Sequence, residues 1–150
     1  MAGDVYTSCV PYEHERIYAA AVYCSDGRLG DQVDEFLHKG LGLPRYDRVA
    51  CPGGPVSLAR RLGAHWETCG VEEQLRVLVQ VHEIKRVILI AHADCAYYSQ
   101  RLGLPVERIE AEQLEDLQKA LWSVECMVPG MSVSRYFARI EGERVTFAAV

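Results

Sequence analysis

The chain has 150 residues, of which 49% are hydrophobic and 25% charged, and its net charge is −5. This length is typical of one domain with its own core, so we expect a single domain over residues 1–150. Frequent charges exclude a membrane-spanning chain, because no apolar run approaches the roughly 18 residues needed to cross a bilayer. The acidic balance argues against nucleic acid as a partner, because phosphate binding relies on clustered basic residues.

The N-terminal residues lack the basic and apolar regions of a signal peptide, so we expect a cytoplasmic protein. Six cysteines are present, namely Cys9, Cys24, Cys51, Cys69, Cys95 and Cys126. In a reducing compartment these are expected to be thiols rather than disulfides. A cysteine near histidine and aspartate is then more often a metal ligand or a nucleophile.

The first half of the chain predicts two strands, each followed by a helix. Residues 17–23 form an apolar run that stops at Cys24-Ser-Asp-Gly-Arg, and residues 31–39 read as a short helix with Asp31 as its cap. Residues 46–50 predict a second strand, which ends in the loop Cys51-Pro-Gly-Gly-Pro. A short helix is expected over residues 55–62.

The second half predicts helices over residues 71–84 and 107–124, from their apolar periodicity. The strand between them, residues 86–91, leads into His92-Ala-Asp-Cys95. The acidic stretch from residue 107 to residue 116 is expected to be a solvated helix face. Residues 134–150 predict one or two strands with a turn near residues 141–143. This order indicates an α/β fold with a mostly parallel sheet covered by helices and with antiparallel strands at one edge.

Potential metal ligands follow two of the predicted strands at the point where each ends. Ligands of open α/β sheets bind beyond the carboxyl ends of the strands, so Cys24 can meet His92 and Cys95 there. Thiolate sulfur and imidazole nitrogen are zinc ligands, and three of them leave a fourth position that Asp26 can reach. The same residues are also compatible with two structural thiols and a hydrogen-bonded core histidine.

Three motifs together resemble the β-class carbonic anhydrases. They are Cys24-Ser25-Asp26-x-Arg28, the Gly53-Gly54 loop and His92-x-x-Cys95, which occur in the same order as in that family. The resemblance covers about residues 19–98, and residues 136–147 look like the closing edge strands of the family. It implies the β-carbonic anhydrase fold for this chain.

The resemblance also implies zinc held by Cys24, His92 and Cys95, with Asp26 either completing the coordination or paired with Arg28. In the open state a zinc-bound hydroxide would hydrate carbon dioxide to bicarbonate, with Asp26 orienting it. Gly53 and Gly54 would lie beside the substrate. The family's dimers imply a homodimer or a higher homo-oligomer.

The chain also departs from the family pattern. Ala50-Cys51-Pro52 stands where the family usually has Arg-Asn and a small residue, and Tyr97 follows the His-x-x-Cys motif closely. Such changes alter the pocket wall but leave the ligands intact. Three other functions therefore stay open: a hydrolase of carbonyl sulfide or carbon disulfide, a non-catalytic zinc protein, and a metal-free enzyme with Cys24 as nucleophile.

Overall fold

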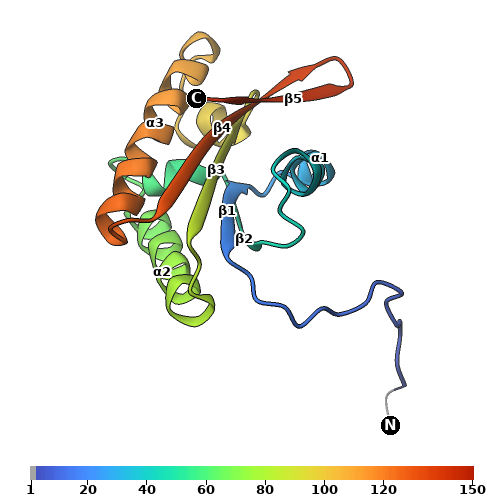
Figure 1. The fold of residues 1–150 in the computed structure, drawn as a ribbon. Helices are drawn as coiled ribbons and strands as arrows, with labels where there is room; N and C mark the ends of the chain where they lie inside the picture. Colours follow the sequence, from blue (N-terminus) through green and yellow to red (C-terminus); the bar gives the residue numbers. More distant parts are fainter. Residues whose placement is uncertain (1–2) are drawn as a thin grey trace.

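A five-stranded sheet with helices on both faces forms the body of the protein (Figure 1). The computed structural model describes residues 3–150. The strands are β1 (Ala19–Cys24), β2 (Asp47–Cys51), β3 (Arg86–His92), β4 (Ser132–Glu141) and β5 (Arg144–Ala149). The helices are α1 (Gly30–Glu35), α2 (His65–His82) and α3 (Val106–Met127), with π-helical turns at Phe36–Gly40 and Tyr97–Arg101 and a 3-10 turn at Gly54–Leu58.

The strands lie in the order β2-β1-β3-β4-β5, so the side of the sheet on which the chain adds its next strand changes at β1. The chain first steps from β1 to β2 on one side, then returns past β1 to add β3 on the other. β1, β2, β3 and β4 pair in parallel, and β5 runs antiparallel to β4 at the edge. The predicted fold class is confirmed. A crevice beyond the carboxyl ends of the strands is expected at such a reversal.

Two apolar layers hold the helices to the sheet. On one face, α2 and α3 pack over alternate strand residues such as Val22 and Leu89. On the other face, α1 and the turn after it cover the intervening residues, including Ala21 and Ile88. The two central strands β1 and β3 are therefore buried on both sides, which explains their continuous apolar sequences.

The predicted elements are present, but several boundaries differ. The helix predicted from residue 31 begins one residue earlier, with Leu29 rather than Asp31 at its cap, and continues as a π-helical turn through Gly40. α2 begins at His65 rather than at residue 71, because polar residues in its first turns hide the apolar period. The helix predicted over residues 55–62 is a 3-10 turn that ends at Leu58.

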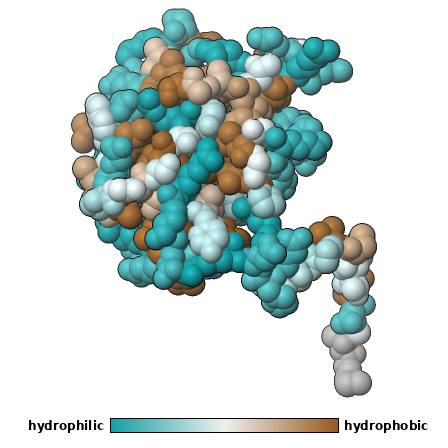
Figure 2. All heavy atoms as spheres, in the orientation of Figure 1, coloured by the Kyte–Doolittle hydropathy of each residue, from teal (hydrophilic) through white to brown (hydrophobic). Residues whose placement is uncertain are grey.

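Residues 3–18 form an irregular segment that leads away from the body, as Figures 1 and 2 show. Near the body it is held by Arg16, which donates to the carbonyl of His82, and by Arg45, which donates to the carbonyls of Glu13 and Glu15. Within residues 3–150, no helix combines the length and the low polarity that crossing a bilayer requires.

Candidate metal centre

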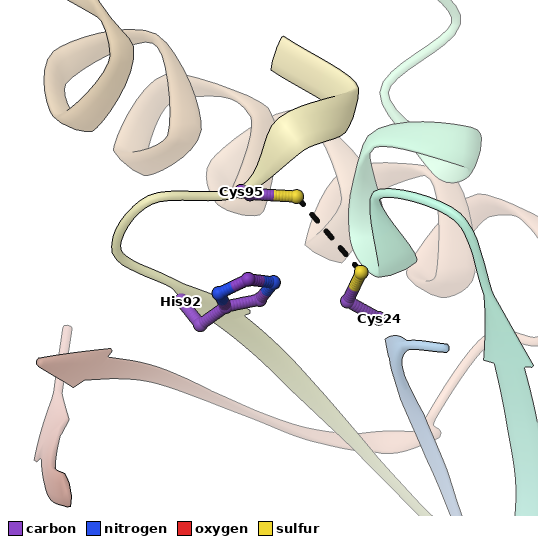
Figure 3. Close-up of side chains that lie close together, drawn as sticks. All are labelled: Cys24, His92 and Cys95. Atoms are coloured by element: carbon purple, nitrogen blue, oxygen red, sulfur yellow. Dashed lines mark hydrogen bonds between the residues drawn. The ribbon is translucent and has the colours of Figure 1, made fainter. Parts of the chain in front are cut away.

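Cys24, His92 and Cys95 meet at the carboxyl ends of β1 and β3 (Figure 3). Their potential ligand atoms all lie within 4.8 Å of one another, and within residues 3–150 they are the one such group of three. The Sγ atoms of Cys24 and Cys95 are 3.9 Å apart, and the imidazole ring points into the same space. β1 and β3 pair directly, so their ends place residues about 70 positions apart in the sequence side by side.

The histidine of this group is fixed from two sides. His92 is 4% exposed, and its Nδ1 lies 2.6 Å from the carbonyl oxygen of Ala93. The side-chain amide of Gln113, on α3, donates to the main-chain carbonyl of His92 over 2.8 Å. With Nδ1 bonded to a carbonyl, Nδ1 carries the proton and Nε2 keeps its lone pair. Nε2 is buried, has no hydrogen-bond partner in the part of the chain that the structure describes, and lies on the side of the ring that faces the two sulfurs.

The two thiols differ in how readily they ionise. A hydrogen bond from Cys95 lowers the pKa of the Cys24 thiol to about 4, against an opposing effect of burial. The hydrogen bond with Cys24, followed by burial, raises the pKa of Cys95. Burial lowers the pKa of His92, but its contact with the Cys24 sulfur outweighs this and raises it overall. The pocket therefore stabilises one thiolate even without a cation, and a cation would favour loss of the second proton.

Asp26 lies two residues beyond Cys24 and is paired with Arg28. The Arg28 Nη2 atom is 2.6 Å from Oδ2 of Asp26, and Nε is 3.0 Å from Oδ1. The main-chain N–H of Arg28 also donates to Oδ1 over 3.0 Å. These hydrogen bonds lower the pKa of Asp26 to about 2, so the carboxylate is ionised at neutral pH. Asp26 is outside the group of three ligand atoms.

The Gly53-Gly54 loop passes directly over the end of β1. A Cβ on Gly54 would lie 2.7 Å from the main-chain nitrogen of Cys24, and this residue has a φ of +55°. A Cβ on Gly53 would lie 2.8 Å from the Tyr97 ring, at a φ of +76°. Both positions thus require glycine for space and for conformation. The main chain of this loop therefore lines one side of the metal centre, beside Cys24.

A polar network under the centre was missed from the sequence. Asp116 is fully buried, although the acidic stretch that it ends was expected to be solvated. It accepts hydrogen bonds from Arg61 and from the Tyr98 hydroxyl, each over 2.7 Å. Burial raises the pKa of Asp116, which these partners partly offset. The aspartate lies on the side of α3 that faces the loop after Cys95, a position that a charge pattern alone does not reveal.

Cys51 and His14 lie outside the centre. The Cys51 thiol, adjacent to Cys24 across the β1–β2 pair, lies 3.6 Å from the carbonyl of Gly54 and from the Ser57 hydroxyl. Burial raises its pKa, so it remains a neutral thiol. His14 is exposed on the N-terminal segment, where its ring packs against Tyr12.

The donor set fits a divalent metal of the zinc type. Two sulfurs and one imidazole nitrogen converge, and the nitrogen is a buried atom with a free lone pair and no other partner. Zinc and similar borderline ions prefer this mixture, whereas magnesium and calcium require oxygen ligands. Three protein donors also leave a fourth coordination position, as in catalytic rather than structural sites.

Comparison with known proteins places the chain in a family and identifies two relatives. The sequence profile of a family described as putative carbonic anhydrase matches residues 14–146. An uncharacterized protein of Rickettsia bellii is 29% identical over 127 residues, covering 81% of this chain and 76% of that protein. A second uncharacterized protein, from Rickettsia conorii, is 26% identical over 128 residues, covering 81% of this chain and 67% of its own.

Two solved carbonic anhydrase structures share this fold. The β-carbonic anhydrase isoform I of Trichomonas vaginalis superposes with a TM-score of 0.58 at 14% identity, covering 92% of this chain and 86% of its own. The Streptococcus mutans carbonic anhydrase gives a TM-score of 0.54 at 16% identity, covering 91% of this chain and 87% of its own. At such identities the similarity establishes the fold alone.

Proposed function

Because the chain belongs to the putative carbonic anhydrase family, we propose that it catalyses the zinc-dependent, reversible hydration of carbon dioxide to bicarbonate. One observation carries the proposal. Cys24, His92 and Cys95 converge as a three-donor group, while the neighbouring Asp26 is held by Arg28 outside that group. The arrangement supports a metal with a free position next to an ionised carboxylate.

In this proposal zinc is held by the two cysteine sulfurs and by Nε2 of His92. Zinc at such a position would supply a Lewis acid that makes a bound water a nucleophile near neutral pH. The two thiolates would neutralise its charge, so the water would acidify less readily than beside three histidines. The hydrogen bonds of His92 to Ala93 and Gln113 hold the ring in the orientation that this role requires.

Asp26 and Arg28 would form the catalytic pair. The ionised carboxylate accepts hydrogen bonds and would orient the attacking water by accepting its proton in a hydrogen bond. The bidentate bond from Arg28 would keep Asp26 from taking the fourth position itself. The same pairing argues against a non-catalytic protein in which Asp26 permanently completes the tetrahedron.

The Gly53-Gly54 loop would bound the substrate position. The two glycines let the main chain of the loop lie against the end of β1 beside Cys24, and the Tyr97 ring and Val56 fill the space next to Gly53. A small molecule such as carbon dioxide or bicarbonate would therefore meet the loop's main chain and the Tyr97 ring on this side.

We also propose that the chain assembles as a homodimer or a higher homo-oligomer. β2 and β5 lie at the two edges of the sheet and leave one side of each strand available for another chain. Light scattering coupled to size exclusion should give at least twice the 16.8 kDa chain mass. A single 16.8 kDa species at micromolar concentration would contradict the assembly but not the proposed chemistry.

Stopped-flow measurement of carbon dioxide hydration tests the function directly, on protein shown to contain zinc at one ion per chain. We expect a rate well above buffer that Asp26→Asn and Arg28→Gln reduce by about 100-fold or more, a typical effect of losing an acid–base group. Asp31→Asn is the matched control, because this exposed acid lies in the first turn of α1, near the pair in the sequence but outside it. No rate above buffer from the zinc-loaded wild type would refute the proposal.

A further inference from the structure

A second candidate reactive site, a cysteine beside a histidine, lies at the start of α2, away from the metal centre. His65 and Cys69 are one helical turn apart, both are exposed, and Nε2 of His65 lies 3.6 Å from the Cys69 sulfur. The Trp66 ring packs edge-on against the imidazole with ring centroids 5.5 Å apart. A thiol beside an imidazole can lose its proton to the ring as the sulfur attacks an electrophile.

The pair opens onto a pocket of about 310 Å³. Thr68 lines this pocket and is 7% exposed, yet its hydroxyl oxygen has no hydrogen-bond partner among residues 3–150. A buried hydroxyl normally has a partner, so the Thr68 hydroxyl is available to a polar molecule in the pocket once its side chain rotates towards it. This observation is independent of the cysteine.

The rest of the pocket wall suggests which molecule fits. Arg60 directs Nε and Nη2 at Glu72, over 3.2 and 2.9 Å, and its side chain is 62% exposed. A guanidinium has five N–H donors, so Arg60 keeps donors for a carboxylate of a bound molecule. The pocket has room for a small peptide-like thiol but not for a folded partner.

We propose that Cys69 is a modification site that forms a mixed disulfide with a small, carboxylate-bearing thiol. The Cys69 sulfur attacks one sulfur of a low-molecular-weight disulfide, a new S–S bond forms, and the original S–S bond breaks. His65 takes the Cys69 proton, and the departing thiolate is protonated in turn. Cys69 is oxidised, the released half of the disulfide is reduced, and no other oxidant is needed.

The chain carries its own matched controls. Cys9 and Cys126 are also exposed free thiols, on the N-terminal segment and on α3. Zinc-containing protein is incubated with oxidised glutathione, and the modification rate of each cysteine is followed by peptide mass mapping. We expect Cys69 to react about tenfold faster than Cys126, and His65→Gln to bring it down to the Cys126 rate. Equal rates at the three thiols in the wild type would overturn the proposal, and this comparison needs no variant.

A second probe tests the kind of thiol. Cystamine is a disulfide with amines and no carboxylates, so the ratio of the Cys69 rate to the Cys126 rate should be lower with cystamine than with oxidised glutathione. Arg60→Gln should bring the Cys69-to-Cys126 rate ratios of the two disulfides closer together and leave the Cys126 rates unchanged. An equal Cys69-to-Cys126 rate ratio with the two disulfides would overturn the assignment of a carboxylate-bearing partner.

Discussion

The side-chain amide of Gln113 donates a 2.8 Å hydrogen bond to the main-chain carbonyl of His92, across a contact buried between α3 and the end of β3. Gln113 is 1% exposed, and no group within residues 3–150 forms a hydrogen bond with its Oε1. The residue therefore contributes one hydrogen bond, and that bond fixes the strand end that carries the imidazole.

Replacing Gln113 with leucine should loosen the metal centre more than it destabilises the fold. The substitution leaves the His92 carbonyl unpaired but also removes the unpaired Oε1, so we expect a stability loss of about 1 kcal/mol. Zinc affinity should fall by roughly tenfold, as is typical when a group that supports a ligand is lost. Competition with a chromogenic chelator measures the affinity. Gln118→Leu, on the same helix but partly exposed, should leave it unchanged.

Gly54→Ala should be far more damaging than an alanine at another glycine with positive φ. The new Cβ would lie 2.7 Å from main-chain atoms of Tyr23 and Cys24, in addition to the strain of φ +55°. Gly103→Ala has a similar φ of +65° but no atom within 4 Å. We expect a loss of about 1 kcal/mol at Gly103 and of about 3 kcal/mol or more at Gly54. Urea unfolding measures the free energy of unfolding of both variants. Equal losses would show that β1 can shift to make room for the new Cβ at little cost.

Asp116→Ala should destabilise the protein by about 3 kcal/mol or more, because it leaves Arg61 and the Tyr98 hydroxyl short of a buried partner. The neighbouring Glu115→Ala is the matched control. Glu115 forms an exposed pair with Lys119, which is worth about 0.5 kcal/mol. Thermal unfolding compares the two variants. If Asp116→Ala cost no more than Glu115→Ala, the buried network would contribute nothing to stability.

Asp34 should contribute stability at neutral pH that is lost in acid. Burial raises the pKa of Asp34, but hydrogen bonds from Tyr46 and Arg48 outweigh it and lower the pKa overall. A lowered native pKa stabilises the fold above the unfolded value of about 3.9, and this stabilisation disappears as the pH falls below it. Asp34→Asn should therefore be less stable than wild type at pH 7, with a difference that shrinks towards about pH 3.

Denaturant unfolding at a series of pH values measures this dependence. Glu35→Gln is the control, because Glu35 is an exposed residue paired only with Lys39 one turn later. Its difference from wild type should be small throughout. A pH-independent difference for Asp34→Asn would mean that the ionised carboxylate is not what stabilises the native state.

Removing zinc should lower thermal stability, because a ligand that binds only the folded state adds to the free energy of unfolding. Cys95→Ser should purify with much less than one zinc per chain, whereas Cys126→Ser, at an exposed free thiol, should keep it. Elemental analysis gives the metal content, and calorimetry with and without chelator gives the stability. Full zinc content in Cys95→Ser would exclude this cysteine as a ligand.

The three motifs and the apolar strands were sufficient to predict the fold class and the convergence of Cys24, His92 and Cys95. This succeeded because both sets of residues follow buried strands directly, and adjacent parallel strands end at the same edge of a sheet. The Asp26–Arg28 pairing was one of two predicted states, and a single sequence cannot choose between them.

Features that depend on packing between distant elements were not predictable. Asp116 has the same charge as its solvated neighbours, and its burial depends on where α3 meets the segment that contains Arg61. The π-helical turn at Tyr97–Arg101 has no periodicity to reveal it, because five residues are too few. The His65–Cys69 pair was not predicted, because α2 was expected to start at residue 71 and residues four apart meet only within a helix.

The reversal of strand order between β1 and β3 also governs when the metal centre can form. Cys24 and Cys95 are 71 positions apart, and β2 and α2 lie in the chain between them, so pairing of β1 with β3 closes a long loop. Contacts between residues so far apart in the sequence form more slowly than local ones. High-affinity zinc uptake should thus be a late event in folding, so a metal-sensitive dye would report completion of the native sheet.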